Sequence, residues 1–127
     1  MVKINVLIDN QPGDDALLEC EHGLSFYIET GCSRLLCDMG ASEKFICNAS
    51  RMGIDLSAID FAFVSHGHAD HTGGLPDYLR TLGEKKVYLS ERISKDMYFS
   101  SRRGSRRDIS TERSVFESHQ DRLVLLK

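Results

Sequence analysis

Three histidines and an aspartate lie within six consecutive residues, and no other segment of the sequence concentrates so much potential chemistry. They are His66, His68, Asp70 and His71. Alternate residues of an extended chain point the same way, so His66 and His68 can reach one ion together. Asp70 and His71 follow where the chain turns and can face a neighbouring position. A solvated loop with histidines present by chance is the alternative, but this spacing favours a divalent-metal site.

The chemistry of these donors indicates which metals fit. Neutral imidazole nitrogens and a carboxylate suit zinc, manganese or iron, whereas calcium prefers a shell of oxygen ligands. Zinc is the first choice among them.

A strand is expected to position this segment. Residues 61–65 form a compact apolar run, which predicts a strand buried on both faces. The polar loop 66–74 follows, and Gly73 and Gly74 within it permit close approach of another segment. In open α/β sheets, sites lie beyond the carboxyl ends of strands. The loop 66–74 has that position.

The hydrophobic pattern of the remaining chain alternates between strand and helix periods, which predicts an α/β fold. Runs typical of strands occupy 2–9, 24–30, 34–38, 86–90 and 122–126. Helical patterns cover 45–52, with Ser42 expected as the N-cap, and 75–82, with one or two further turns over 91–97. Residues 98–121 are expected to be irregular.

Length and charge limit the possible organisation. The chain has 127 residues, which suits one domain spanning 1–127. Residues 1–77 hold twelve acidic and four basic residues, a net charge of −8, whereas residues 78–127 hold seven acidic and twelve basic residues, a net charge of +5. An acidic half suited to metals is therefore followed by a basic half suited to anions.

The expected location is the cytoplasm. The first residues lack a signal-peptide pattern, and no apolar stretch approaches the roughly 20 residues that a membrane-spanning helix needs. The four cysteines show no Cys-x-x-Cys spacing, and free thiols are the favoured interpretation, with disulfides as the alternative. Cys32 and Cys37 are expected to pack in strands and not to bind metal.

Two further features could contact a small-molecule substrate. Four arginines, Arg102, Arg103, Arg106 and Arg107, lie within six residues and could bind an anion. The simplest interpretation is a solvated and mobile loop, and nucleic acid is disfavoured because aromatic residues are not interleaved with the arginines. His22 precedes a strand, where a structural role and a contact near the pocket both remain open.

The pattern around the histidines resembles that of a known family. The string His-x-His-x-Asp-His at 66–71, followed by Thr-Gly-Gly-Leu at 72–75, resembles the signature of the metallo-β-lactamase superfamily. Cys-Asp-Met-Gly at 37–40 resembles its Asp-x-Gly element. Residues 21–29, with Asp-Asn at 9–10, resemble the branch of metal-dependent hydrolases related to a dihydropterin synthase of methanopterin biosynthesis.

This resemblance implies a fold and a set of roles. The fold would be the N-terminal half of a four-layer αβ/βα sandwich, a mixed sheet with flanking helices. His66 and His68 would bind a first metal ion, and Asp70 and His71 a second. Asp70 would also act in catalysis by orienting or deprotonating the attacking water. Asp38 would fix the loop through hydrogen bonds from behind the ligands, although a turn residue at a strand end is the alternative.

The resemblance also implies ligands that this chain does not offer. Members of the family have two such halves, and the second half contributes further histidine and aspartate ligands. After His71 only His119 remains, and its surroundings indicate a surface or loop position. Two hypotheses follow: a metal-dependent hydrolase acting on an ester- or phosphate-type bond, or a truncated, catalytically silent metal-binding module that needs a partner half.

A lone half of this fold is expected to self-associate. Two short helices cannot cover all the apolar residues of the expected strands, among them Ile4, Val6, Phe26, Ile28, Leu36, Phe61 and Phe63. A large exposed apolar patch favours association, and a symmetric homodimer or higher oligomer would bury it.

Overall fold

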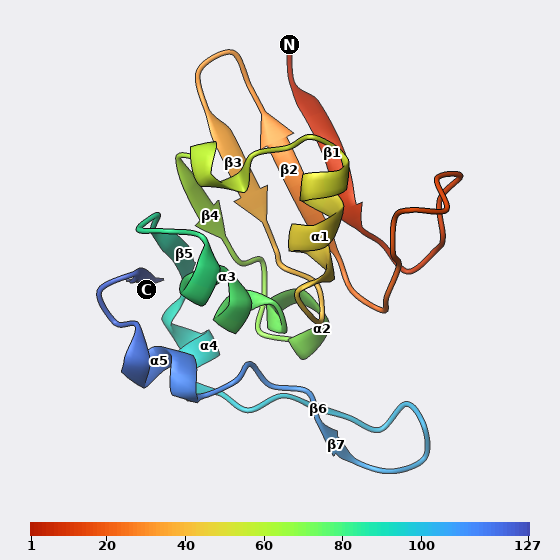
Figure 1. The fold of residues 1–127 in the computed structure, drawn as a ribbon. Helices are drawn as coiled ribbons and strands as arrows, with labels where there is room; N and C mark the ends of the chain where they lie inside the picture. The colour runs from red at the N-terminus through yellow and green to blue at the C-terminus, as the bar shows by residue number, and fades with distance from the viewer.

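The computed structural model describes residues 1–127, and its centre is a six-stranded mixed sheet (Figure 1). The strand order is β1-β2-β3-β4-β5-β8, with antiparallel pairing from β1 to β3 and parallel pairing from β3 to β8. The strands are β1 (Lys3–Ile8), β2 (Ser25–Glu29), β3 (Arg34–Cys37), β4 (Phe61–Phe63), β5 (Val87–Ser90) and β8 (Leu123–Leu126). The sheet is therefore of the mixed type expected from the sequence.

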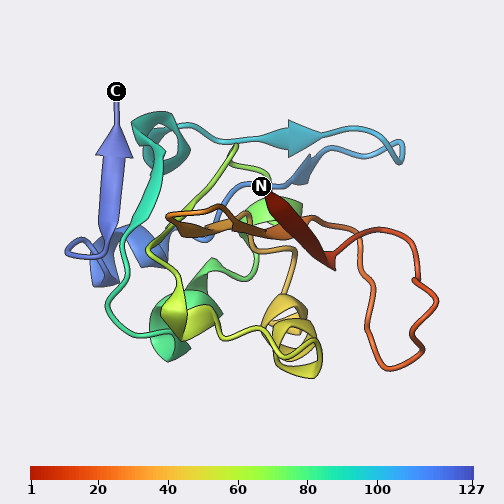
Figure 2. The same cartoon turned by 90° about the horizontal axis from the view of Figure 1, so that it is seen from above.

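Helices α1 (Lys44–Arg51) and α3 (Leu75–Thr81) lie on one side of this sheet, as the view from above shows (Figure 2). Phe45 and Ala49 form the buried stripe of α1. Gly53 and Gly83 follow the two helices with φ angles of 71°, a left-handed conformation that ends a helix without steric cost for glycine. The hydrophobic core of 18 buried residues includes residues of both helices and of the sheet, together with Ile93 and Val115 from two shorter helices.

The shorter elements lie between the main strands and helices along the chain. They are the 3₁₀ turn η1 (Leu56–Ala58), α2 (Ala69–Thr72), α4 (Glu91–Lys95), β6 (Phe99–Ser100), β7 (Arg107–Asp108) and α5 (Ser114–Ser118). Strands β6 and β7 pair as a small antiparallel hairpin that extends past α2 (Figure 1). No helix is both long enough and apolar enough to cross a membrane.

The two faces of the sheet differ in how well they are covered. Strand register places Tyr27, Leu36, Ala62 and Val87 in one row on the side of α1 and α3, and all are buried. The opposite face carries rows of apolar residues that are exposed or only half-buried: Ile4, Val6, Phe26, Ile28, Leu35, Cys37, Phe61, Phe63, Tyr88 and Val124. We call this second surface the open face.

Several local expectations need correction. Strand 61–65 is shorter than expected, and Phe61 and Phe63 on the open face are only half-buried. Leu36 belongs to the covered face, where it is fully buried. The N-cap of α1 is Glu43 and not Ser42. The Ser42 hydroxyl donates to the Glu21 carboxylate at 2.7 Å and accepts the Lys44 N–H at 3.4 Å.

Two segments expected to lack regular structure contain short elements. The loop 66–74 holds one helical turn, α2, and the segment 98–121 holds β6, β7 and α5. Elements of two to five residues show no hydrophobic period, so the pattern could not indicate them.

Candidate metal centre

Asp38 connects the end of β3 to the segment that follows β4. Its carboxylate is buried and accepts the Ser65 backbone N–H at 2.7 Å and the Ser65 hydroxyl at 2.6 Å. The same carboxylate accepts a hydrogen bond from His71 Nδ1 at 2.8 Å. A buried charge must be compensated, and these three donors compensate it. Asp38 thereby fixes both ends of the segment 65–71.

This network assigns the tautomers of two histidines. His71 donates its Nδ1 proton to the carboxylate, which leaves the Nε2 lone pair free. Ser65 gives its single hydroxyl proton to Asp38, so its oxygen accepts the Nδ1 proton of His66 at 2.8 Å. The Nε2 atom of His66 is therefore also unprotonated. Unprotonated imidazole nitrogens are the form that binds a metal ion.

The three imidazoles of the segment converge. The His66 ring centroid lies 4.1 Å from that of His71 and 4.7 Å from that of His68. Burial lowers the pKa of His66 below its ordinary value, and the neighbouring His71 and His68 add to this effect. A lowered pKa favours the neutral form of His66, which is the form that can bind a metal ion.

Asp70 lies at the edge of this cluster and links it to the N-terminal part of the chain. Its Oδ2 atom is 3.5 Å from His71 Nε2 and 3.4 Å from His22 Nε2. His22 is exposed, and its Nδ1 lies 3.1 Å from the Asn10 side-chain oxygen. His22 therefore has a structural partner and also faces the candidate site, so both interpretations from the sequence have a counterpart.

Two glycines allow the residues that follow β3 to pack closely against residues 65–74, which we call the histidine segment. A Cβ atom added to Gly73 would lie 2.2 Å from the Ala41 carbonyl oxygen, and one added to Gly74 would lie 2.2 Å from that of Met39. Both distances are far below any allowed contact with backbone. The Met39 N–H also donates to the His71 carbonyl at 2.8 Å. Backbone packing, and not only side-chain hydrogen bonding, thus holds the segment in place.

A cavity of about 680 Å³ opens beside the cluster. His68, Asp70 and His22 line one part of its wall, and Arg102, Arg103 and Arg107 from the β6–β7 hairpin also line it. We call this the arginine cavity. Arg106 does not line it, because its guanidinium lies over the Phe99 ring, 3.9 Å from the centroid.

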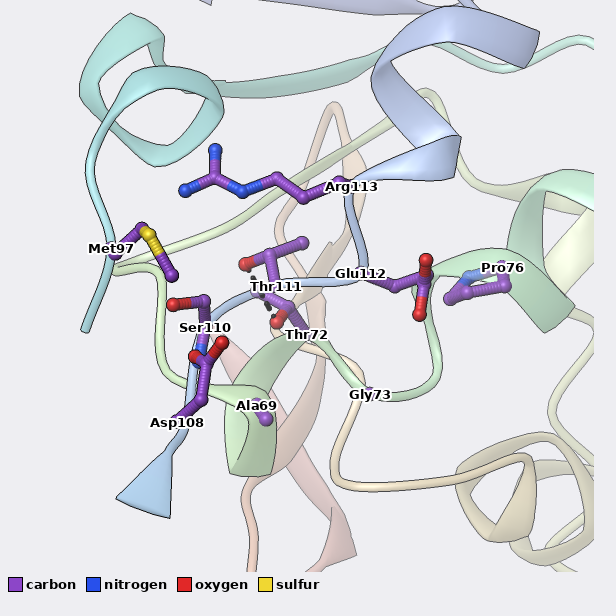
Figure 3. A pocket seen from close by; sticks show the side chains of 10 residues that line it. All are labelled: Ala69, Thr72, Gly73, Pro76, Met97, Asp108, Ser110, Thr111, Glu112 and Arg113. Carbon is purple, nitrogen blue, oxygen red and sulfur yellow. Dashed lines mark hydrogen bonds between the residues drawn. The ribbon is translucent and has the colours of Figure 1, made fainter. Parts of the chain in front are cut away.

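A second cavity of about 510 Å³ lies next to α2 (Figure 3). Within it Thr72 and Thr111 share a hydrogen bond of 2.9 Å, and Thr111 also donates to the Gly67 carbonyl at 3.1 Å. Arg113 extends toward α4 and donates to the Ser94 carbonyl at 2.6 Å. Because these polar groups in the wall already bind one another, their main role is to hold segment 108–113 against the histidine segment.

The remaining expected residues lie elsewhere. His119 directly follows α5 in a loop, as expected, and is half-buried with a buried, unpartnered Nδ1. All four cysteines are free. Burial raises the pKa of Cys37 to about 11, and the neighbouring Asp38 adds to this. Such a thiol stays protonated at neutral pH, which fits strand packing better than metal ligation.

Comparison with known proteins identifies the family. The family profile of the metallo-beta-lactamase superfamily matches residues 18–125. The chain belongs to the metallo-beta-lactamase superfamily. A curated relative from Methanocaldococcus jannaschii, 7,8-dihydropterin-6-methyl-4-(beta-D-ribofuranosyl)-aminobenzene-5'-phosphate synthase, is 32% identical over 89 residues, which cover 66% of this chain and 30% of the relative.

Solved structures of the superfamily share the fold. The crystal structure of a metal-dependent hydrolase of the beta-lactamase superfamily matches with a TM-score of 0.73 and 26% identity, covering 100% of this chain and 43% of that one. A B3 metallo-beta-lactamase with an active-site glutamic acid matches with a TM-score of 0.56 and 21% identity, covering 87% of this chain and 42% of that one. The chain thus spans less than half the length of these relatives.

The donor set fits the metal dependence of the superfamily. A carboxylate oxygen of Asp38 and ring nitrogens of His66 and His71 lie within 4.8 Å of one another, which makes these three a possible metal site. Because the Asp38 carboxylate already accepts three hydrogen bonds, we assign it the positioning of His71 and Ser65 and not direct ligation. His68 and Asp70 lie outside this group of three but border the same cluster.

Sequence reasoning gave no role to two residues that the structure brings into the site. Ser65 joins Asp38 to His66, and Tyr98 packs its ring 5.5 Å from that of His68. The only sequence signal for Ser65 is its place directly before His66. Tyr98 lies in a segment without periodic pattern, so nothing in the sequence placed it here.

Proposed function

We propose that the chain is a metal-dependent hydrolase whose histidine segment binds one or two divalent metal ions, with zinc as the first choice and manganese or iron as alternatives. His66 and His68 would hold the first ion, and Asp70 and His71 the second. The observation that carries this proposal is the hydrogen-bond network of Asp38, which leaves the Nε2 atoms of His66 and His71 unprotonated within one cluster.

When bound, a divalent metal supplies Lewis acidity and lowers the pKa of water to about 7. The residues of the chain supply the rest. Asp38 holds His71 and, through Ser65, His66 in their ligating tautomers. Asp70 is partly exposed and borders the arginine cavity, where its carboxylate would orient or deprotonate the attacking water. The bond cleaved would be of the ester or phosphate type.

A second candidate is a catalytically silent metal-binding module that needs a partner half. It is favoured by the small number of ligands on this chain, because a tight zinc site uses three or four. The chain covers 43% of the metal-dependent hydrolase and 30% of the curated synthase. In either case the free cysteines support a reducing compartment, and we propose the cytoplasm.

Metal analysis of variants tests the proposal. His66→Ala and His68→Ala are each expected to remove most of the metal from the purified protein, because each supplies one of few ligand bonds. His119→Gln is the matched control, since His119 lies at the end of α5. Elemental analysis that finds wild-type metal content in both alanine variants would show that this segment is not the site.

Turnover separates the two candidates. Metal stoichiometry per chain is measured together with hydrolysis of a generic phosphodiester and of a lactone. A metal-loaded chain that hydrolyses either compound, with the activity lost in His66→Ala, supports the hydrolase. A metal-loaded chain without turnover supports the silent module.

A further inference from the structure

The hairpin of β6 and β7 carries unpaired positive charge. Arg102, Arg103, Arg106 and Arg107 are all exposed, and none forms an ion pair with an acidic residue. By contrast, Arg80 on α3 pairs with its neighbour Asp77. Clustered cations without carboxylate partners repel one another and are stabilised by a bound anion.

Three of these arginines face the same cavity as the histidine segment. Arg102, Arg103 and Arg107 line the arginine cavity together with His68 and Asp70. Asp70 is the sole acidic residue in its wall, so the cavity as a whole is basic. The volume of about 680 Å³ suits a small molecule. A ligand bound here would have one end at the arginines and the other at the histidines.

The chemistry of the wall points to a phosphate group. A guanidinium offers a planar fork of donors that matches two oxygens of a phosphate, and several arginines can share the charge of a dianion. A nucleic acid is less well served, because binding of single strands relies on open aromatic faces. Phe99 is the only Phe, Tyr or Trp in this wall, and the Arg106 guanidinium already lies over its ring at 3.9 Å.

We propose that Arg102, Arg103 and Arg107 bind the phosphate group of a small-molecule substrate and thereby place its scissile bond beside His68 and Asp70. This inference rests on the proposed hydrolase function and adds the substrate class to it. Arg106 acts differently: its stacking on Phe99 supports the hairpin and contributes little to the anion. The four neighbouring arginines thus provide their own control.

Phenyl phosphate is a suitable probe, with benzoate as a singly charged anion of similar size and phenyl acetate as an uncharged ester. Their binding to the full chain is measured by isothermal titration calorimetry, for the wild type and for Arg103→Ala, Arg107→Ala, Arg107→Lys and Arg106→Ala. Measurements are made on the protein as purified and after treatment with a chelator, because a bound metal would itself attract phosphate. Circular dichroism checks that each variant is folded.

The expected result is specific to position. Arg103→Ala and Arg107→Ala should each weaken binding of phenyl phosphate roughly tenfold, as for the loss of a charge-assisted hydrogen bond. Arg107→Lys should recover part of this loss, because it keeps the charge but not the fork. Arg106→Ala should change affinity less than about twofold, because its charge lies outside the cavity and is screened. Phenyl phosphate should bind more tightly than benzoate or phenyl acetate.

Hydrogen exchange provides a second measurement. The segment between β6 and β7 is exposed throughout, and two-residue strands are weak, so its amides should exchange fast in the free protein. Phenyl phosphate should slow this exchange in the wild type and in Arg106→Ala, but not in Arg107→Ala.

Several results would overturn the inference. Equal losses for all three alanine variants would indicate a diffuse charge effect, as would binding abolished at about 0.3 M salt. Equal affinity for benzoate and phenyl phosphate would exclude phosphate as the recognised group. Tighter binding of a single-stranded oligonucleotide, weakened alike by the three alanine variants, would assign the hairpin to nucleic acid.

Failure of this inference can be distinguished from failure of the proposed function. If phenyl phosphate binds through Arg103 and Arg107 while metal content is independent of His66 and His68, the metal assignment is wrong and the anion site stands. If metal content depends on the histidines while phenyl phosphate does not bind, the hydrolase proposal stands and the substrate class is wrong.

Discussion

Asp38 has a left-handed backbone, with φ of 57°, which few residues other than glycine adopt. Aspartate and asparagine tolerate this region better than most side chains. The position is maintained because the carboxylate and the backbone are held on several sides: the Asp38 N–H donates to the Phe63 carbonyl at 3.0 Å, and the carboxylate accepts from Ser65 and His71. These hydrogen bonds hold Asp38 in its strained backbone conformation, and the same bonds position the histidines.

Asp38→Asn tests whether the Asp38 carboxylate positions the histidines, because it replaces one carboxylate oxygen by an amide nitrogen. Asparagine has the same shape and tolerates the backbone angle, but its side chain has lost the charge and one acceptor oxygen. Metal affinity should fall roughly 10–100-fold, as for other residues that orient metal ligands. The measurement is competition for zinc with a chelating dye.

Asp14→Asn removes the same charge from an exposed position and serves as the control. Unchanged zinc affinity in Asp38→Asn, with the fold intact, would mean that Asp38 is only a turn residue at the end of β3. That was the alternative left open by the sequence.

At this scale the sequence predicted which residues could be ligands, because residue type and spacing suffice for that. It could not predict the hydrogen bonds of Ser65, because a serine before a histidine has many possible partners. Nor could it separate Arg106 from its three neighbours. Arg106 lies over Phe99 because of the backbone conformation of the hairpin, which the sequence spacing of the arginines does not determine.

At the scale of the elements, the close contact of Gly73 and Gly74 with the backbone after β3 fixes where the histidine segment lies relative to the sheet. Gly23 makes a similar approach, since an added Cβ would lie 2.5 Å from the Asp70 carbonyl oxygen. The segment is thus pressed between two pieces of backbone. Its placement depends on the absence of side chains at these positions.

Gly74→Ala is therefore expected to destabilise the protein. The new methyl group would meet the Met39 carbonyl at 2.2 Å, and backbone cannot move aside as a flexible side chain can. Overpacking of this kind costs about 1–3 kcal/mol in the free energy of unfolding. Denaturation by urea, followed by circular dichroism, measures the change.

Gly31→Ala is the matched control, because an added Cβ there meets nothing within 4 Å. It should leave stability nearly unchanged. Equal stability of Gly74→Ala and Gly31→Ala would show that the β3 end and the histidine segment are not in close contact.

Elements with a clear period were predictable, and those without one were not. The six strands of the main sheet and helices α1 and α3 lie within about two residues of their expected bounds, within the ordinary uncertainty of element ends. Helix α2 and the β6–β7 hairpin form because tertiary contacts hold them. One such contact is the hydrogen bond of 2.7 Å from the Ala69 N–H to the Ile109 carbonyl.

At the scale of the whole molecule, the open face is an apolar surface that no helix layer covers. Ile4 and Val6 are 58% and 45% exposed, and the apolar rows continue across β2, β3 and β4. Burying apolar surface contributes roughly 25 cal/mol per Å², so a continuous face of this kind favours association.

We expect the chain to form a homodimer through the open face. Ile28→Lys should shift the dimer toward monomer, because a lysine at the centre of the face would bury its charge. Multi-angle light scattering at micromolar concentration measures the mass. Leu17→Lys, an exposed site outside the sheet, is the control. A wild-type chain that remains a monomer would contradict this expectation.

The sequence predicted that apolar strand residues would remain uncovered, since their number exceeds what two short helices can cover. It placed Leu36 wrongly among them. A single-residue shift in strand register exchanges the faces, and the sequence alone does not fix that register.

The two edges of the sheet are not alike. Strand β1 has an irregular register between Val6 and Ile8 and carries Lys3, two devices that obstruct strand addition. Strand β8 is the uncharged run Leu-Val-Leu-Leu, regularly paired with β5 on one side. Fibril growth under destabilising conditions would therefore start from β8, and a charge placed at Leu125, which is 45% exposed, would delay its onset.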